Sequence, residues 1–272
     1  MNQPTNSGPQ IHPTAIIGEN VTLGQGVVVG PQAILYDNVT LGDHCFVGPR
    51  VTIGEPDARF YEETSAPPQQ TDAEYQFPAT IIGARALIRS GTVIYAGCRL
   101  GDQLRTGHYA VLREGTVAGS HCSFGTFAQS DGDCTLGDFV RIHYAAHVCR
   151  TARIGSYVWI YPYTVLTNDL HPPCNQCVAG PVIEDYAVIT THCVILPRVR
   201  IGSHALVGAN SVVARDVPPR AVVVGAPAKI VGSVDAIHCD FEGRVDRPYP
   251  WPTHFSAGYP WEPAGWDPEP EE

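Results

Sequence analysis

The sequence has no long hydrophobic run and no excess of basic residues. Its 272 residues carry 17 Lys and Arg against 27 Asp and Glu, a formal net charge of −10, which argues against nucleic acid or an anionic membrane as the main partner. No stretch of about 18 apolar residues occurs, so no membrane-spanning helix is predicted. The first ten residues are polar, without a basic-then-apolar order. We therefore expect no signal peptide and a cytoplasmic location.

The composition also predicts few helices. The chain contains 27 Gly and 24 Pro, which favours many turns and few helices. Most of the nine cysteines recur at one place of the six-residue unit described below, where a small inward side chain is needed. These cysteines are predicted to be buried free thiols in a reducing compartment: Cys45, Cys98, Cys122, Cys134 and Cys193.

What the sequence does have is a six-residue period. Ile, Leu or Val opens nearly every block from Ile11 to Ile53, from Ile82 to Leu166 and from Ile183 to Val213. Neither a helix nor an isolated strand favours every sixth position, whereas a hexapeptide period is the signature of a parallel β-helix. Three blocks form one triangular coil, so residues 18 apart stack in a column, and Gly and Asn suit the positive φ of its corners. The prediction is an all-β prism of about nine coils.

Two interruptions and a change of composition divide the chain. The repeat breaks at about residues 55–80 and again at 170–182, and both segments are predicted to leave the prism as loops. The first is equally compatible with a surface insertion and with a binding role. Residues 1–232 form the predicted β-helix domain, and residues 233–272 form an acidic Pro- and Trp-rich C-terminal extension. The aromatic residues of this extension favour a packed arm over a flexible tail.

The repeat blocks, the closing segment Gly225-Ala226-Pro227-Ala228-Lys229-Ile230-Val231-Gly232 and the break at Thr167-Asn168-Asp169 together resemble the hexapeptide-repeat acyltransferases, over about residues 11–232. Within that superfamily the chain looks most like the nucleotide-sugar N-acetyltransferases. The resemblance implies a left-handed β-helix, a homotrimer with active sites between neighbouring prisms, acetyl-CoA as co-substrate, and the amine of a nucleotide-linked amino sugar as acceptor. It implies no metal.

The candidate site residues follow from the resemblance and from the coil arithmetic. His143-Tyr144 stands where related enzymes carry amides that hold the acceptor, and His108, Thr126 and Tyr144 share one column. We predict that His143 is the general base, since histidine titrates near neutral pH, and that His143→Asn lowers kcat about 10²–10⁴-fold. The predicted catalytic residues are His143, Asp169 and His108; the substrate-binding residues Tyr144, Asn168 and Thr167; and the cofactor-binding residues Ala146, Thr164 and Lys229.

Three other functions remain open at this point. Transfer of the acetyl group to a hydroxyl of a sugar or another small molecule would need the same base and the same acetyl-CoA site. His171, Cys174 and Cys177 have spacings that zinc tolerates, but no second cysteine pair follows, and His143 with His147 is a weak match to prism-shaped carbonic anhydrases. A scaffold built on the same prism is the alternative without catalysis.

Overall fold

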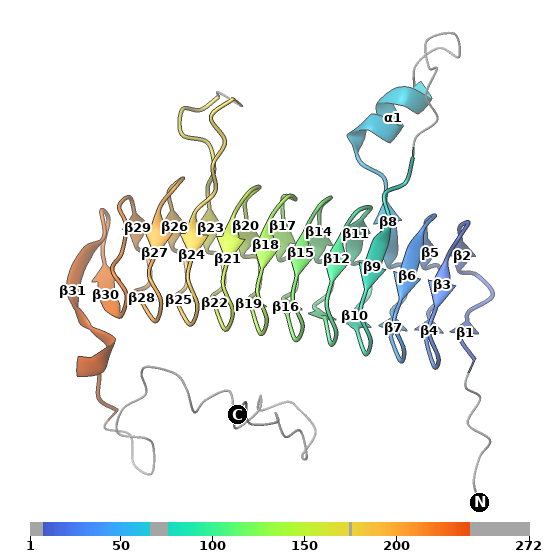
Figure 1. Ribbon diagram of the computed structural model, residues 1–272, viewed down its shortest axis with the longest axis horizontal. Coiled ribbons are helices and arrows are strands. Elements are labelled where there is room, and N and C mark those ends of the chain that lie inside the picture. Colours follow the sequence, from blue (N-terminus) through green and yellow to red (C-terminus); the bar gives the residue numbers. More distant parts are fainter. Residues whose placement is uncertain (1–7, 66–75, 174–175, 240–272) are drawn as a thin grey trace, which may run out of the picture.

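The computed structural model describes residues 8–65, 76–173 and 176–239, which form a triangular prism with one parallel sheet on each side (Figure 1). Between β1 and β29, consecutive strands belong to different sheets and paired strands are three places apart, so the chain winds round the prism. This is the left-handed parallel β-helix that was predicted. We call the twelve-, ten- and nine-stranded sheets A, B and C.

The elements are short, and most strands contain two residues. Sheet A consists of β1 (Gln10–Ile11), β4 (Val28–Val29), β7 (Phe46–Val47), β10 (Leu87–Ile88), β13 (Arg105–Thr106), β16 (Ser123–Phe124), β19 (Arg141–Ile142), β22 (Trp159–Ile160), β25 (Val188–Ile189), β28 (Leu206–Val207), β30 (Ala221–Val224) and β31 (Lys229–Ser233). Sheet B consists of β2 (Ile16–Ile17), β5 (Ile34–Leu35), β8 (Thr52–Glu55), β11 (Val93–Tyr95), β14 (Val111–Leu112), β17 (Gln129–Ser130), β20 (His147–Val148), β23 (Val165–Leu166), β26 (Val194–Ile195) and β29 (Val212–Val213). Sheet C consists of β3 (Thr22–Leu23), β6 (Val39–Leu41), β9 (Thr80–Ile82), β12 (Arg99–Leu100), β15 (Val117–Ala118), β18 (Thr135–Leu136), β21 (Arg153–Ile154), β24 (Val182–Ile183) and β27 (Arg200–Ile201).

The six-residue period has a direct structural cause. In the two-residue strands from β4 to β29, the second residue is the block opener; it points inward and is buried. The openers of β1 and β2, Ile11 and Ile17, are exposed at the N-terminal end of the prism. Because the register between coils is kept, inward residues stack, as Phe124 does on Ile142. The five cysteines predicted to be inward are all buried and free, which confirms their assignment as packing residues.

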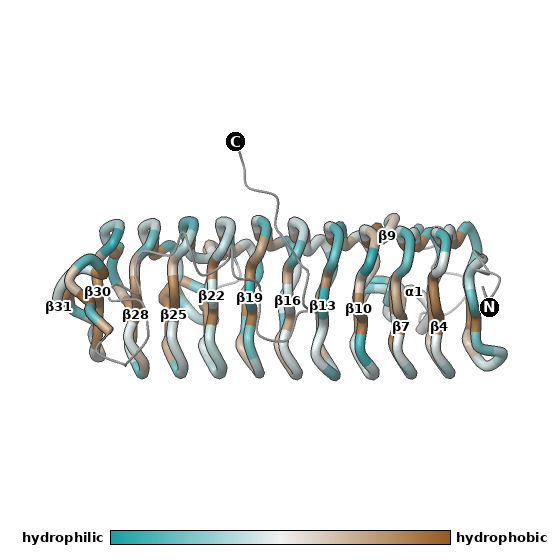
Figure 2. Tube along the Cα trace, turned by 90° about the horizontal axis from the view of Figure 1, so that it is seen from below, coloured by the Kyte–Doolittle hydropathy of each residue, from teal (hydrophilic) through white to brown (hydrophobic). Residues whose placement is uncertain are grey.

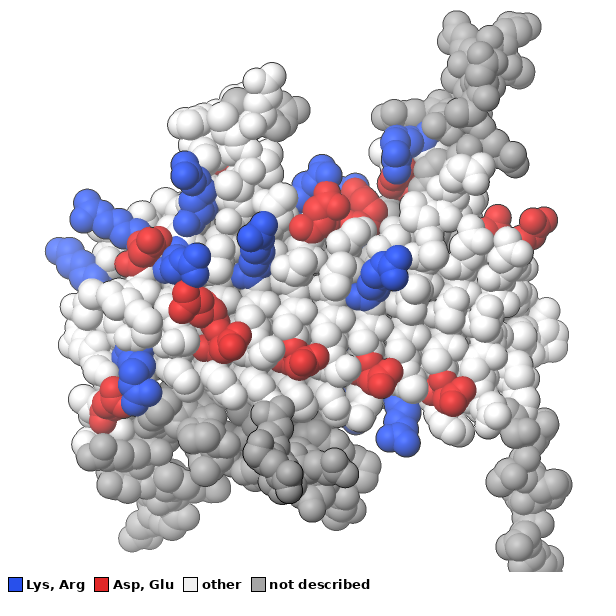
Figure 3. All heavy atoms as spheres, in the orientation of Figure 1, with Lys and Arg blue, Asp and Glu red and all other residues white. Residues whose placement is uncertain are grey.

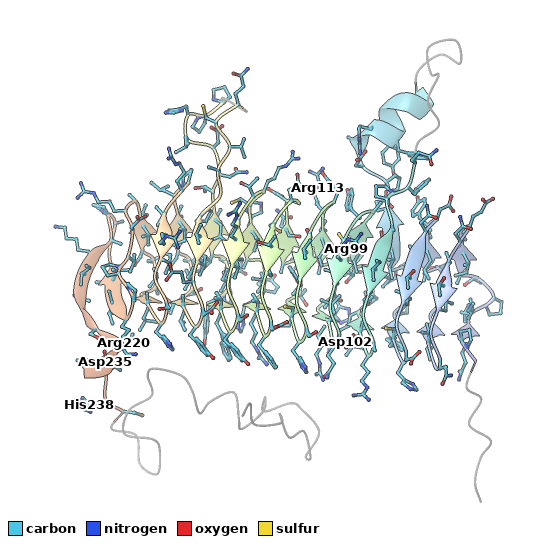
Figure 4. The ribbon with its side chains drawn as sticks, viewed as in Figure 1. Arg99, Asp102, Arg113, Arg220, Asp235 and His238 are labelled. Carbon is cyan, nitrogen blue, oxygen red and sulfur yellow. The ribbon has the colours of Figure 1, made fainter. Side chains whose placement is uncertain are left out.

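The corners are tight turns at positive φ, held together by hydrogen bonds between coils. At the corner from sheet C to sheet A, the Asp138 carboxylate accepts a hydrogen bond from the backbone N of Ser120 at 2.7 Å, and Asp185 does the same for Ser156 at 2.8 Å. In turn, the Asp138 backbone N donates to the Ser156 hydroxyl at 3.1 Å. The resulting ladder appears as a row of acidic side chains along the lower edge of the prism, where Asp102 lies (Figures 3 and 4).

Both interruptions of the repeat leave the same corner, between sheets B and C (Figure 1). The first contains a helix that the sequence did not predict, α1 (Ala58–Ser65). Asp57 caps its start, because its carboxylate accepts a hydrogen bond from the backbone N of Arg59 at 2.9 Å. Phe77 ties the segment to the prism, with its ring 5.6 Å from that of Tyr36. In the second, an isolated bridge joins Asp169 and Val178.

The C-terminal end of the prism differs from the prediction by one or two coils. The prediction of about nine coils fits sheet C only, since sheets A and B have twelve and ten strands. The additional strands of sheet A are β30 and β31. β30 follows the irregular turn at Val217–Arg220 and pairs with β28, and β31 pairs with β30 in antiparallel orientation. Beyond β31 a short 3-10 helix, η1 (Val234–Ala236), packs against the prism, where Asp235 pairs with Arg220 (Figure 4). Residues 240–272, most of the extension for which a packed arm was predicted, lie outside the described residues.

No helix in the described part of the chain has the length and apolar character needed to cross a bilayer.

Candidate active site

A histidine–aspartate pair lies on sheet B, below the two segments that leave the prism. His147 opens β20, and Asp131 directly follows β17 on the preceding coil. The Nε2 atom of His147 is 2.8 Å from Oδ2 of Asp131. Nδ1 of the same ring is buried and faces the backbone of Leu166. The ring edge that carries Nε2, beside the half-exposed carboxylate, is therefore the edge that a substrate can approach.

The pair tunes the protonation of both partners. The hydrogen bond to Asp131 raises the pKa of His147 above its ordinary value, against the opposing effect of burial. The same hydrogen bond is the main reason why the pKa of Asp131 is lowered. Because the carboxylate stabilises the imidazolium form, the histidine is a stronger base than an isolated imidazole, and the pair is suited to taking up a proton.

Polar side chains of neighbouring coils surround the pair. Arg113 lies one coil before Asp131, in the same outward row, between the two extruded segments (Figure 4). Its guanidinium forms two hydrogen bonds to Glu114, at 2.8 and 3.0 Å, and lies 5.5 Å from the ring of Tyr95. Its positive charge contributes to the lowered pKa of Asp131. This face thus combines a proton acceptor with a cation.

Thr167, Asn168 and Asp169, the break that the sequence singled out, lie beside this face. They follow β23, whose Val165 pairs with His147 on the preceding coil. The Asn168 amide donates to the carbonyl of Arg150 at 3.2 Å, and the Asp169 carboxylate accepts from the backbone N of His171 at 2.9 Å. The structure therefore brings this predicted trio toward His147.

His143, the predicted base, lies on a different side of the prism. It directly follows β19 of sheet A, whereas Asp169 follows β23 of sheet B, so a single chain does not bring the two together. Its ring stacks on Tyr161 at 4.7 Å and lies 5.7 Å from the ring of Trp159. Burial, with the nearby positive charge of Arg141, lowers the pKa of His143 to about 4. A base that weak is poorly matched to neutral pH, and the catalytic role of His143 stays a prediction.

His108 and Tyr144 lie at the corner between sheets A and B, in the predicted column. The backbone N of His108 donates to the Thr126 hydroxyl at 3.1 Å, and its Nδ1 lies 2.8 Å from the Ser90 hydroxyl. Tyr144 is exposed and forms an edge-to-face contact with Tyr163.

The three predicted cofactor-binding residues are separated. Ala146 and Thr164 are fully buried inside the prism, and the Thr164 hydroxyl donates to the carbonyl of Thr190 at 2.8 Å. Their side chains cannot reach a ligand on the surface, so any contact would come from the backbone at those positions. Lys229 is exposed and opens β31, on the last coil.

Among the described residues, no three His, Cys, Asp or Glu side chains are grouped so that they could hold a metal ion. Cys174 lies outside the described residues, so the hypothesis of zinc bound by His171, Cys174 and Cys177 is not tested.

The sequence reasoning missed the His147–Asp131 pair, although a signal was available. The column rule aligns residues 18 positions apart, whereas Asp131 and His147 are 16 positions apart. On sheet B, Asp131 directly follows the inward residue Ser130, and His147 directly precedes Val148, the inward residue that stacks on Ser130 from the next coil. Residues at those two places meet diagonally across neighbouring coils.

Comparison with known proteins agrees with this architecture. Two families match parts of the chain: Bacterial transferase hexapeptide (six repeats) over residues 21–55, and Hexapeptide repeat of succinyl-transferase over residues 198–230. Together with the fold, they define the chain as a hexapeptide-repeat β-helix protein. By their descriptions, both matching families are repeats of transferases.

Individual relatives are similar over short segments. A 2,3,4,5-tetrahydropyridine-2,6-dicarboxylate N-acetyltransferase of Brevibacillus brevis is 40% identical over 72 residues, which are 26% of this chain and 29% of the relative. The Staphylococcus aureus enzyme of the same name is 40% identical over 77 residues, 28% of this chain and 31% of the relative. The chain thus spans less than a third of the length of these curated relatives. Among solved structures, a Francisella novicida UDP-N-acetylglucosamine acyltransferase superposes with a TM-score of 0.44 at 20% identity, covering 82% of this chain and 70% of that one.

Proposed function

We propose that the protein is an acyltransferase that transfers an acetyl group from acetyl-CoA to an amine, with His147 as the general base. The observation that carries this proposal is the hydrogen bond between His147 and Asp131, which raises the pKa of the histidine and so makes it a stronger base for proton transfer. The matches to N-acetyltransferases support the reaction class. The acceptor we favour is the amino group of a nucleotide-linked amino sugar.

The proposed chemistry requires few groups. The acceptor nitrogen attacks the thioester carbonyl carbon, a C–N bond forms, and the C–S bond breaks. When neutral His147 carries its proton on Nδ1, which faces the Leu166 backbone, Nε2 has a free lone pair. The amine enters between Nε2 and the Asp131 carboxylate, donates a hydrogen bond to that carboxylate and gives its proton to Nε2, and the leaving CoA thiolate takes up a proton. Asp131 thus positions the amine before the transfer and stabilises the imidazolium after it. Asn168 and Asp169, at the adjacent corner, are placed to orient the acceptor.

The same proposal includes a homotrimer. The corner between sheets A and B exposes an aromatic stripe, formed by Tyr109 (48% exposed), Phe127 (52%), Tyr144 (41%) and Tyr163 (47%). The rings contact one another along the prism axis, with Tyr109 stacked on Phe127 at 5.7 Å. A row of exposed aromatic residues is typical of an interface. If three prisms pack in parallel about this corner, sheet A of one subunit faces sheet B of the next.

The test is acceptor-dependent release of CoA from acetyl-CoA, measured with UDP- and dTDP-linked amino sugars and with the matching sugars that carry a hydroxyl in place of the amine. The proposal expects release with an amine only. Release with the hydroxyl sugars alone would replace it with O-acetyl transfer. Absence of release with either set, from protein that binds CoA, would overturn the proposed acceptor class.

A further inference from the structure

Sheet A carries a basic cavity whose residues have no part in the proposed proton transfer. It has a volume of about 430 Å³, and the residues that line it include Arg89, Arg105, Arg141 and His143 but no Asp or Glu. Figure 2 looks directly onto this sheet, and the cavity lies over β10, β13, β16 and β19. It is on a different side of the prism from the His147–Asp131 pair.

The shape of the cavity follows from two outward rows of residues that cross the coils. In the first row Ser123 pairs with Arg105 on one side and with Arg141 on the other. Adjacent coils are about 4.8 Å apart, so the two guanidinium groups flank a gap of about two coils over a small serine.

The second row has the same arrangement. Gly107 and Gly125 form its centre, with Arg89 one coil before and His143 one coil after. A Cβ added to Gly107 would lie 2.1 Å from the backbone N of Thr126, and one added to Gly125 would lie 2.7 Å from that of Tyr144. Close coil stacking therefore requires glycine at both positions, and this leaves the centre of the second row without side chains.

The walls of this cavity are cationic donors held in place. The Arg89 Nη1 donates to the carbonyl of Thr106 at 2.7 Å, and the Arg141 guanidinium lies 4.8 Å from the ring of Trp159. Arginine presents several N–H groups in a fixed plane, which suits phosphate oxygens. The cavity is large enough for a nucleotide fragment and its charge favours an anion.

We propose that this cavity, which we call the arginine groove, binds the pyrophosphate of a nucleotide. Arg105 and Arg89 hold phosphate oxygens above Gly107 and Gly125, and His143 lines the opposite end. Both CoA and a nucleotide-linked sugar carry a pyrophosphate, so the expected ligands rest on the proposed function. In the proposed trimer, the arginine groove of one subunit faces the His147–Asp131 pair of its neighbour, and a bound nucleotide would point its reacting end toward that pair.

The test is calorimetric binding of CoA, of UDP and of dTDP to the full chain and to Arg105→Gln. Loss of a charge-assisted hydrogen bond to phosphate should weaken binding by about 10–100-fold. The matched control is Arg99→Gln, which removes the same charge from an exposed position of β12 on sheet C. Weaker binding of CoA alone would assign the groove to the acyl donor. Weaker binding of UDP or dTDP alone would assign it to the acceptor.

Equal affinities for the original chain and Arg105→Gln, or equal losses in Arg105→Gln and Arg99→Gln, would overturn the proposal. Because binding is measured without turnover, the outcome is separate from that of the proposed function. If binding is lost specifically in Arg105→Gln while the original chain releases no CoA with any acceptor, the arginine groove is supported and the acyltransferase function is overturned. If the original chain is fully active but its nucleotide affinities do not depend on Arg105, the function is supported and the groove is overturned.

Discussion

Two histidines four positions apart have opposite environments. His143 is half-buried beside aromatic rings, and this burial, together with the positive charge of Arg141, lowers its pKa to about 4. His147 is bonded to a carboxylate, so its pKa rises. The cause is the coil: between these positions the chain turns from sheet A to sheet B, and each side of the prism has its own neighbours.

This contrast predicts a pH dependence. His147 must be neutral to accept a proton, so activity should rise as the pH increases through its raised pKa. Asp131→Asn removes the negative partner and lowers that pKa, so the acidic limb of kcat against pH should move to lower pH. The measurement is the pH–rate profile.

Asp133→Asn is the matched control for Asp131→Asn. The Asp133 carboxylate is two positions away and bonds to Arg150 at 2.8 Å instead of to a histidine, so its loss should leave the limb in place. An acidic limb that stays in place in Asp131→Asn, or that moves equally in both variants, would count against His147 as the titrating base.

At the scale of elements, the corner ladder adds side-chain hydrogen bonds to the backbone bonds that join successive coils in the three sheets. Asp138 accepts from the Ser120 backbone N, and Asp138→Ala leaves that donor without its partner. The expected cost is about 1 kcal/mol of unfolding free energy, measured as a lower urea midpoint. Glu19→Ala, another corner acid but one outside this ladder, should change the midpoint less. Equal midpoints for the two variants would show that the ladder adds no stability.

The sequence predicted the elements better than their contacts. A period of six specifies strand, corner and inward residue at once, so the β-helix, its buried cysteines and its two extruded segments could all be predicted. Helix α1 could not, because it depends on a local cap at Asp57 within a segment that has no repeat. The His147–Asp131 pair and the Arg105–Ser123–Arg141 row are contacts between coils, and they appear only once the outward positions of each sheet are aligned.

At the scale of the whole molecule, the prism should form a trimer through its exposed aromatic corner. Phe127→Glu places a charge in the middle of the stripe, where burial against another subunit would be costly. Light scattering should give about three times the 29.3 kDa chain mass for the original chain and a lower mass for this variant. Val117→Glu, an exposed change on sheet C, is the control and should keep the trimer. A monomeric original chain, or a trimer that survives Phe127→Glu, would contradict this interface.

The central claim is that His147, and not His143, removes the proton from the acceptor. Its most direct test is kcat for acetyl transfer by His147→Asn and His143→Asn, measured at saturating acetyl-CoA with an acceptor that the original chain uses. Loss of a general base lowers kcat by about 10²–10⁴-fold, and we expect this loss in His147→Asn. His143→Asn should keep most of kcat, and a change in KM would reflect its place in the arginine groove. A near-normal kcat in His147→Asn, with the large loss in His143→Asn, would contradict the account and restore His143 as the base.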